Sequence, residues 1–134
     1  MRISKFEEIE SWKEARRLTS TIYAQTSKPK FSKDYGLRDQ IQRTSVSIMA
    51  NIAEGFDAGS IKGFVNFLNF AYRSAWEVQL SLYAALDQKY LEEADFETIY
   101  DDAAVIKKLV GGLIKYLKTN QEARTEEQEL GTKN

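Results

Sequence analysis

The feature that most constrains the fold of this chain is its scarcity of helix-breaking residues. Its 134 residues include one proline, Pro29, and seven glycines. Proline bars a helix from continuing through it and glycine lowers helix stability, so long stretches without either residue favour helices over strands and turns. The sequence therefore predicts an all-α protein.

Four segments of the chain carry the periodicity of amphipathic helices. In each, apolar residues recur at steps of three and four, which places them on one helix face. The segments cover about residues 7–26, 37–55, 61–89 and 94–118. Helices of about 20 residues are about 30 Å long, and with short connections they predict an antiparallel up-down-up-down four-helix bundle. We assign residues 1–119 to this bundle and expect the charged, aperiodic residues 120–134 to form a mobile tail.

Three glycines lie in or beside these helices, where glycine usually lowers stability, so each is expected to have a structural role. Gly55 follows the second apolar stripe, where we expect it to end the helix as a C-terminal cap with positive φ. Gly111 and Gly112 lie inside the last segment. Each glycine within a helix costs about 1 kcal/mol relative to alanine, so we expect this pair to permit a close helix contact or a kink.

Cysteine and histidine are both missing from the chain. Without them it has no disulfides, no thiolate metal sites and no Ser-His-Asp or Cys-His catalytic site, and the absence of cysteine suits a reducing compartment. No apolar run approaches the roughly 20 residues of a membrane span, and the N-terminal residues lack the apolar core of a signal peptide. We expect a cytoplasmic protein that uses no metal or cofactor and does not contact membranes.

One helix face in the second segment is polar where a plain amphipathic helix needs no such stripe. The members of this polar stripe are Gln40, Arg43, Ser47, Asn51 and Glu54. Ser74 and Glu77 of the third helix are natural partners for it. One interpretation is a hydrogen-bonded layer that fixes helix register, in which Asn51, Glu54, Ser74 and Glu77 meet and Arg43 bridges carboxylates.

The alternative interpretation of the polar stripe is an active site. It would use Glu54, Glu77 and Arg43, because carboxylates on neighbouring helices form the di-metal sites of some bundles. Those sites also use histidine, which this chain lacks, and within the predicted helix Glu54 has no acidic neighbour at helical spacing. We therefore favour the structural network and expect a protein that is not an enzyme.

The third helix has too many aromatic residues to bury on one face. Its rings are Phe64, Phe67, Phe70, Tyr72, Trp76 and Tyr83. They spread around most of the helix circumference, so some must remain exposed on a single copy of the chain. Since monomeric proteins rarely leave large apolar patches exposed, we expect these rings to be buried between subunits of a homo-oligomer.

Basic residues are concentrated early in the chain, although the net charge is −1. The candidate patch consists of Arg16, Arg17, Lys28, Lys30, Lys33 and Arg38. It is either a solvated surface or a phosphate-binding patch for RNA, with Phe31 and Tyr35 placed to stack on unpaired bases. Asp34 and Asp39 lie in the same segment, and six acids lie between residues 92 and 102. Basic residues converging on one face would favour nucleic acid, whereas acids among them would favour a protein partner.

Three motifs of the sequence resemble a known family. They are F-x-x-I-x-x-W-x-x-A from Phe6, the block L-R-D-Q-I-Q-R-T-S-V-S-I-M-A-N-I-A-E-G ending at Gly55, and F-L-N-F-A-Y-R-S-A-W-E ending at Glu77. The chain resembles the 23S rRNA-intervening-sequence proteins from Phe6 to about Leu117. The resemblance implies a four-helix bundle that assembles into a homopentameric ring, with no established catalytic residues.

A related protein bears on which kind of partner this chain binds. The accessory protein of diversity-generating retroelements is similar to this family, and it forms a basic ring that engages a reverse transcriptase and nucleic acid. The present chain is slightly acidic overall. The sequence thus predicts a non-enzymatic, self-assembling bundle that binds or scaffolds structured RNA or a nucleoprotein; the alternative is a protein–protein adaptor without direct nucleic-acid contact.

Overall fold

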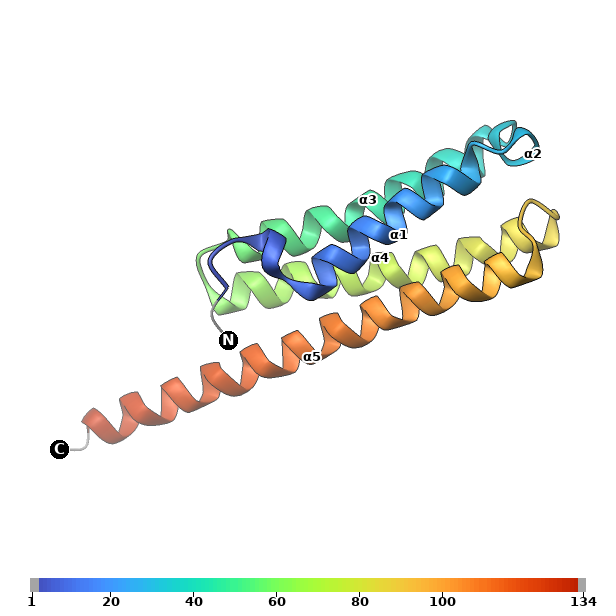
Figure 1. The fold of residues 1–134 in the computed structure, drawn as a ribbon. Helices are drawn as coiled ribbons and strands as arrows, with labels where there is room; N and C mark the ends of the chain where they lie inside the picture. Colours follow the sequence, from blue (N-terminus) through green and yellow to red (C-terminus); the bar gives the residue numbers. More distant parts are fainter. Residues whose placement is uncertain (1–2, 133–134) are drawn as a thin grey trace.

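The protein is an all-helical bundle in a computed structural model that describes residues 3–132, with side chains described for residues 3–121. Its elements are η1 (Phe6–Glu8), α1 (Glu10–Thr26), α2 (Pro29–Ser32), α3 (Tyr35–Phe56), α4 (Ile61–Asp87) and α5 (Glu93–Thr132). The four long helices alternate in direction along the bundle (Figure 1). The predicted antiparallel up-down-up-down four-helix bundle is confirmed.

Neighbouring helices follow the chain around the bundle. The principal contacts join α3 to α4, α4 to α5 and α1 to α3, and the smaller contact between α1 and α5 closes the circle. The α1/α5 seam therefore lies opposite the α3/α4 pair. The core contains the predicted apolar stripes, including Ile41, Ile48 and Ile52 of α3, each fully buried.

Polar caps fix where α3 and α4 begin. The Asp34 carboxylate accepts a hydrogen bond from the Leu37 backbone N–H at 3.2 Å, and Ser60 Oγ accepts one from the Gly63 N–H at 3.0 Å. Such caps satisfy backbone donors that have no partner inside the helix. The Asp34 cap starts α3 at Tyr35, close to the predicted start.

The loop around Pro29 contains a short helix that the sequence analysis did not predict. Pro29 is its first residue, a position where proline's fixed φ suits a helix and its missing N–H is not needed. The Phe31 side chain is buried and stacks on Tyr90 with ring centroids 5.0 Å apart. Tyr90 also donates its hydroxyl hydrogen bond to Asp34 at 3.0 Å. These contacts tie α2 to the turn between α4 and α5.

The expected role of Gly55 as a positive-φ cap is wrong. Gly55 lies inside α3, and among the described glycines only Gly59 has a positive φ. A Cβ on Gly55 would come within 2.9 Å of both Phe64 Cδ1 and Phe67 Cβ, and within 3.2 Å of the Phe64 carbonyl oxygen. Gly55 is therefore a contact residue that lets α3 and α4 approach closely.

The last helix continues past its predicted end near residue 118. Residues 119–130 contain neither glycine nor proline and are rich in glutamine and glutamate, good helix formers, so the loss of apolar periodicity does not end α5. Figure 1 shows α5 extending beyond the ends of the other helices. We expected residues 120–134 to form a mobile tail, but most of their side chains lie outside the described ones. The mobile tail and the domain boundary at residue 119 therefore stay predictions.

Candidate interaction surfaces

Three residues of the predicted polar network meet where α3 packs against α4. Ser47 Oγ lies 3.1 Å from Ser74 Oγ, and Asn51 Nδ2 donates to both the Ser47 carbonyl oxygen at 2.8 Å and Ser47 Oγ at 3.0 Å. Ser74 is buried, and Ser47 and Asn51 are half-buried. The contact between Ser47 and Ser74 joins α3 to α4 through short side chains.

The other members of the predicted network lie on the surface. Gln40, Arg43, Glu54 and Glu77 are exposed. Within the described residues no ion pair joins Arg43 to Glu54 or Glu77, so the expected bridging of carboxylates is not observed. Among the described residues, neither Glu54 nor Glu77 forms a hydrogen bond with Ser47 or Ser74. These long side chains lie on the solvent side of the α3/α4 contact, where water can satisfy them.

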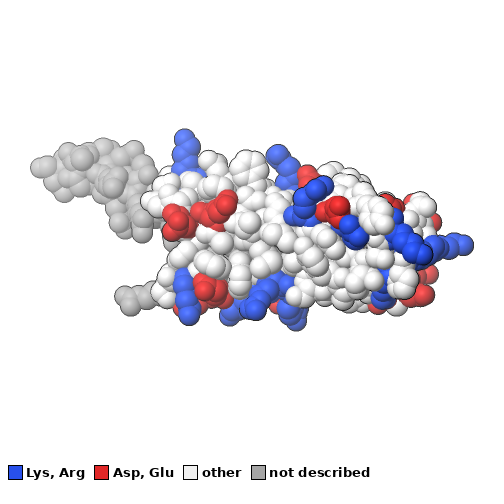
Figure 2. Space-filling model, turned by 90° about the horizontal axis from the view of Figure 1, so that it is seen from above, with Lys and Arg blue, Asp and Glu red and all other residues white. Residues whose placement is uncertain are grey.

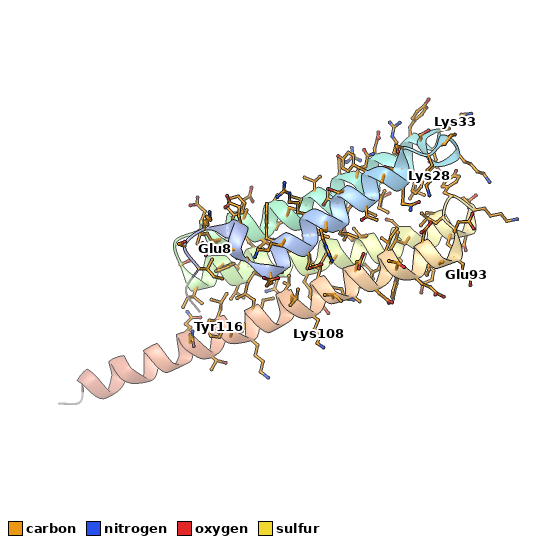
Figure 3. All side chains as sticks on the ribbon, in the orientation of Figure 1. Glu8, Lys28, Lys33, Glu93, Lys108 and Tyr116 are labelled. Atoms are coloured by element: carbon orange, nitrogen blue, oxygen red, sulfur yellow. The ribbon has the colours of Figure 1, made fainter. Side chains whose placement is uncertain are left out.

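The candidate basic patch is divided between two places. Arg16 and Arg17 lie midway along α1, whereas Lys28, Lys30, Lys33 and Arg38 surround α2 at one end of the bundle. Figure 3 shows Lys28 and Lys33 at that end, across from Glu93 at the start of α5. The structure therefore brings four of the six residues together and leaves two apart. We call the four residues around α2 the basic end.

Acidic residues lie among the basic ones at both places. Arg38 Nε donates to Asp39 Oδ1 at 2.9 Å, and Lys28 Nζ lies 3.9 Å from Asp95 Oδ2. On α1, Arg17 pairs with Glu14. Figure 2 shows positive and negative groups interspersed on the face in view. These pairs reduce the positive potential that a phosphate backbone would meet, although exposed pairs contribute little to stability.

The two aromatic residues that the sequence placed to stack on bases, Phe31 and Tyr35, differ in their exposure. Phe31 is buried against Tyr90 and cannot stack on a base without leaving the core. Tyr35 is exposed, and the Arg38 guanidinium lies 4.9 Å from its ring centroid. Lys30 and Lys33 are exposed and make no ion pair with any described residue. The basic end thus offers two unpaired lysines and one accessible ring.

The outer side of α4 exposes several large apolar side chains, as expected from its aromatic content, with the exposed Asn69, Arg73 and Glu77 among them. We call it the aromatic face and define it by Phe70, Tyr72, Trp76, Leu80 and Tyr83. Leu80 is 57% exposed, Phe70 52% and Trp76 50%. Val46 of α3 is also exposed. Leu80 was missed at the sequence level, although its place one turn after Trp76 was a signal.

Two grooves lie along the seam between α1 and α5. The first, of about 1030 Å³, is bordered by Glu14, Arg16 and Arg17 of α1 and by Asp102 of α5. Partial burial raises the pKa of Asp102 above its ordinary value, with Glu14 and Asp101 adding to the rise and Arg17 opposing it. A mixed-charge groove of this kind is poorly suited to phosphate.

The second groove lies further along the seam, and we call it the seam groove. It has a volume of about 690 Å³, and its apolar lining comes from Ile3, Ile9, Leu109, Gly112, Leu113 and Tyr116. Ser11 also lines it; this residue is 2% exposed, and its Oγ has no hydrogen-bond partner in the described part of the chain. A buried hydroxyl without a partner costs about 1–3 kcal/mol.

The glycine pair of α5 makes no close contact within the protein. No heavy atom lies within 4 Å of the position that a Cβ would take on Gly111 or Gly112. The expected close approach of another helix is therefore not made inside one copy of the chain, and Gly112 leaves open space in the wall of the seam groove.

Neither a metal centre nor a membrane-spanning helix is found in the described residues. No three carboxylates among them gather in the way that a metal ion would require. Among the described helices, none combines the length and the apolar character needed to cross a membrane. Glu54, Glu77 and Arg43, the residues of the alternative enzyme hypothesis, are all exposed to solvent.

The fold and its surfaces define a small four-helix-bundle protein with an exposed aromatic face and surfaces of mixed charge. The family model of the 23S rRNA-intervening sequence protein matches residues 7–112, and the chain belongs to this family. It is similar to the crystal structure of a protein with unknown function from the S23 ribosomal protein family of Bacteroides thetaiotaomicron VPI-5482. The two are 28% identical with a TM-score of 0.73, over 78% of this chain and 95% of that one. No curated protein matches the chain.

Proposed function

We propose that this protein is a non-enzymatic, self-associating bundle that acts as a protein–protein adaptor. The aromatic face carries the proposal, because five large side chains on one helix are left in contact with water. Covering such a surface is a main driving force of protein association. The homopentamer implied by the family resemblance is the assembly that we propose.

The charge distribution favours a protein partner over direct RNA contact. Arg17, Lys28 and Arg38 each have a carboxylate partner, and the acidic start of α5 reaches the basic end through Asp95. By the criterion drawn from the sequence, acids among the bases support an adaptor.

Light scattering coupled to size-exclusion chromatography tests the self-association. The chain has a mass of 15.4 kDa, and we expect the wild type to elute as a multiple of it. Leu80→Glu, which adds a charge to the centre of the aromatic face, should release folded monomers. Ala24→Glu, at an exposed position on α1, is the control and should leave the assembly intact. A monomeric wild type, or an assembled Leu80→Glu variant, would contradict the proposal.

Binding of structured RNA through the basic end is the second candidate function. It is favoured by Lys30 and Lys33, which are exposed without a described ion-pair partner beside the accessible ring of Tyr35. Phosphate contacts of this kind weaken steeply as salt rises, because binding releases counterions.

Fluorescence anisotropy with a structured rRNA fragment, at about 50 and 200 mM salt, separates the two candidates. The adaptor proposal expects no binding at either salt concentration. Salt-sensitive binding that is lost in the double variant Lys30→Glu and Lys33→Glu would establish the RNA function instead. The matched control is Lys62→Glu with Lys115→Glu, because these exposed lysines lie far from the basic end and the pair makes the same change of charge.

A further inference from the structure

Helix α5 carries a second apolar stripe, on a side that the core does not cover. It consists of Val105, Leu109, Gly112 and Tyr116, at steps of four, three and four residues. Val105 is 47% exposed, Tyr116 39% and Leu109 36%, and Gly112 is also exposed. Alternating steps of three and four are those by which a helix packs along one partner helix. We call these four residues the outer stripe of α5.

The outer stripe has a hollow at Gly112. No heavy atom lies within 4 Å of the position that a Cβ would take on this glycine, and Gly112 borders the seam groove of about 690 Å³ together with Ile9 and Leu113. When two helices pack, a large side chain of one fills a hollow between the side chains of the other. The outer stripe is therefore shaped to receive a large side chain from a facing helix.

The aromatic face of α4 has the complementary shape. Tyr72, Trp76, Leu80 and Tyr83 follow one another at steps of four, four and three residues, with the large Trp76 ring among them. Trp76 is 50% exposed and Leu80 57%. Because the aromatic face and the outer stripe are both exposed within one copy of the chain, neither covers the other there. A second copy can bring the two surfaces together.

The charges beside the two surfaces also match in sign. Arg73 and Glu77 lie among the residues of the aromatic face, and Lys108 and Glu8 border the seam groove beside the outer stripe. Figure 3 shows the Lys108 side chain pointing away from the other helices. Glu77, Arg73 and Lys108 are exposed and make no ion pair within the described part of the chain. In a contact between copies, Glu77 can meet Lys108 and Arg73 can meet Glu8, and such complementary charges fix how two surfaces align.

We propose that the aromatic face of one copy packs against the outer stripe of α5 in the next copy, with Trp76 placed over Gly112. This inference rests on the proposed self-association and names the surface that receives the aromatic face. Two different surfaces meet, so the contact is head-to-tail, and such contacts form rings when the rotation between copies closes. One interface of this kind buries both apolar surfaces, whereas a symmetric contact between two aromatic faces would leave the outer stripe in water.

Mixing two assembly-deficient variants of the full-length chain tests the head-to-tail contact. Gly112→Glu fills the hollow of the outer stripe with a charged side chain, and Leu80→Glu places a charge on the aromatic face. We expect each variant alone to sediment as a monomer of 15.4 kDa in analytical ultracentrifugation. An equimolar mixture at the same total concentration should form a 1:1 dimer of twice that mass. The dimer forms because the Gly112→Glu copy keeps an intact aromatic face and the Leu80→Glu copy keeps an intact outer stripe.

The matched control is Gly36→Glu, the same substitution at an exposed glycine of α3, which should assemble as the wild type does. Circular dichroism checks that each variant is folded, and Val105→Glu on the same stripe replaces Gly112→Glu if that variant is not.

The possible outcomes separate this inference from the proposed function. A wild type that is itself monomeric would overturn both. A wild type that assembles, with a folded outer-stripe variant that assembles as well, would overturn the head-to-tail contact and leave self-association through the aromatic face standing. Two monomeric variants that stay monomeric when mixed would also overturn the contact, because a head-to-tail interface must be restored by the mixture.

Discussion

At the scale of single residues, Asp102 is a carboxyl group whose environment opposes its charge. It lies half-buried at the α1/α5 seam, near Glu14 and Asp101 as well as Arg17. Burial raises its pKa above the ordinary 3.8, because leaving water disfavours the charged form. As pH rises, the unfolded chain therefore releases this proton before the folded protein does.

The raised pKa of Asp102 predicts how the stability of the protein depends on pH. The contribution of Asp102 is most favourable below pH 3.8 and is lost as pH rises through its raised native pKa. Asp102→Asn should therefore raise the urea midpoint of unfolding at pH 7, and the gain over wild type should shrink near pH 3. Glu97→Gln, an exposed change of equal charge on α5, is the control. An equal gain at both pH values would contradict the prediction.

The polar stripe shows what a helical spacing can predict at this scale. The spacing placed Ser47 and Asn51 on one face of α3, and Ser74 of α4 contacts Ser47 there. It did not tell which part of the stripe the neighbouring helix covers. Arg43 and Glu54 lie at the solvent edge of the same stripe, because their depth is set by the angle at which α4 packs, which the residues of α3 alone do not encode.

At the scale of elements, Gly55 controls how closely α3 and α4 approach. A methyl group there would press on Phe64 and Phe67 at 2.9 Å, and the backbone oxygen of Phe64 cannot move as a side chain can. Both a helix cap and a close helix contact select glycine, so the sequence pattern alone could not separate the two. The four long helices were nevertheless predicted in the correct order, whereas the short helix α2 was not predicted.

We predict that Gly55→Ala destabilises the protein by about 1–3 kcal/mol, the usual cost of an overpacked contact. The matched control is Gly36→Ala, where the added Cβ has no neighbour closer than Asp34 Oδ1 at 3.9 Å. That variant should gain about 0.4–1 kcal/mol, because alanine restricts the unfolded chain. Urea denaturation measures both changes. A neutral or stabilising Gly55→Ala would show that α3 and α4 can separate without cost.

At the scale of the whole molecule, the described core ends well before the chain does. The last fully buried core residue is Val110, and the partly buried Leu113, Ile114 and Leu117 pack against the core after it. A chain ending at residue 120 should therefore unfold with a free energy within about 0.5 kcal/mol of the full chain. Chemical denaturation compares the two.

A shorter truncation is the control for this domain boundary. A chain ending at residue 109 loses Val110 and the three residues packed after it. Large-to-small changes at single core sites already cost about 2–5 kcal/mol, so this chain should be largely unfolded. A loss of stability above about 1 kcal/mol in the chain ending at residue 120 would place part of the fold in the C-terminal segment and contradict the assignment of the bundle to residues 1–119.

The order of the helices around the bundle also has a consequence for folding. The contacts of α1 with α3, of α3 with α4 and of α4 with α5 join elements that follow one another along the chain, whereas the α1/α5 seam joins its first and last helices. The hairpins can form at a small cost in loop entropy, but the seam must close the longest loop for the smallest of these contacts. We therefore expect the native bundle to open first at the seam, whereas exchange of α1 with a second copy would also require α1 to leave α3, with which its contact is larger.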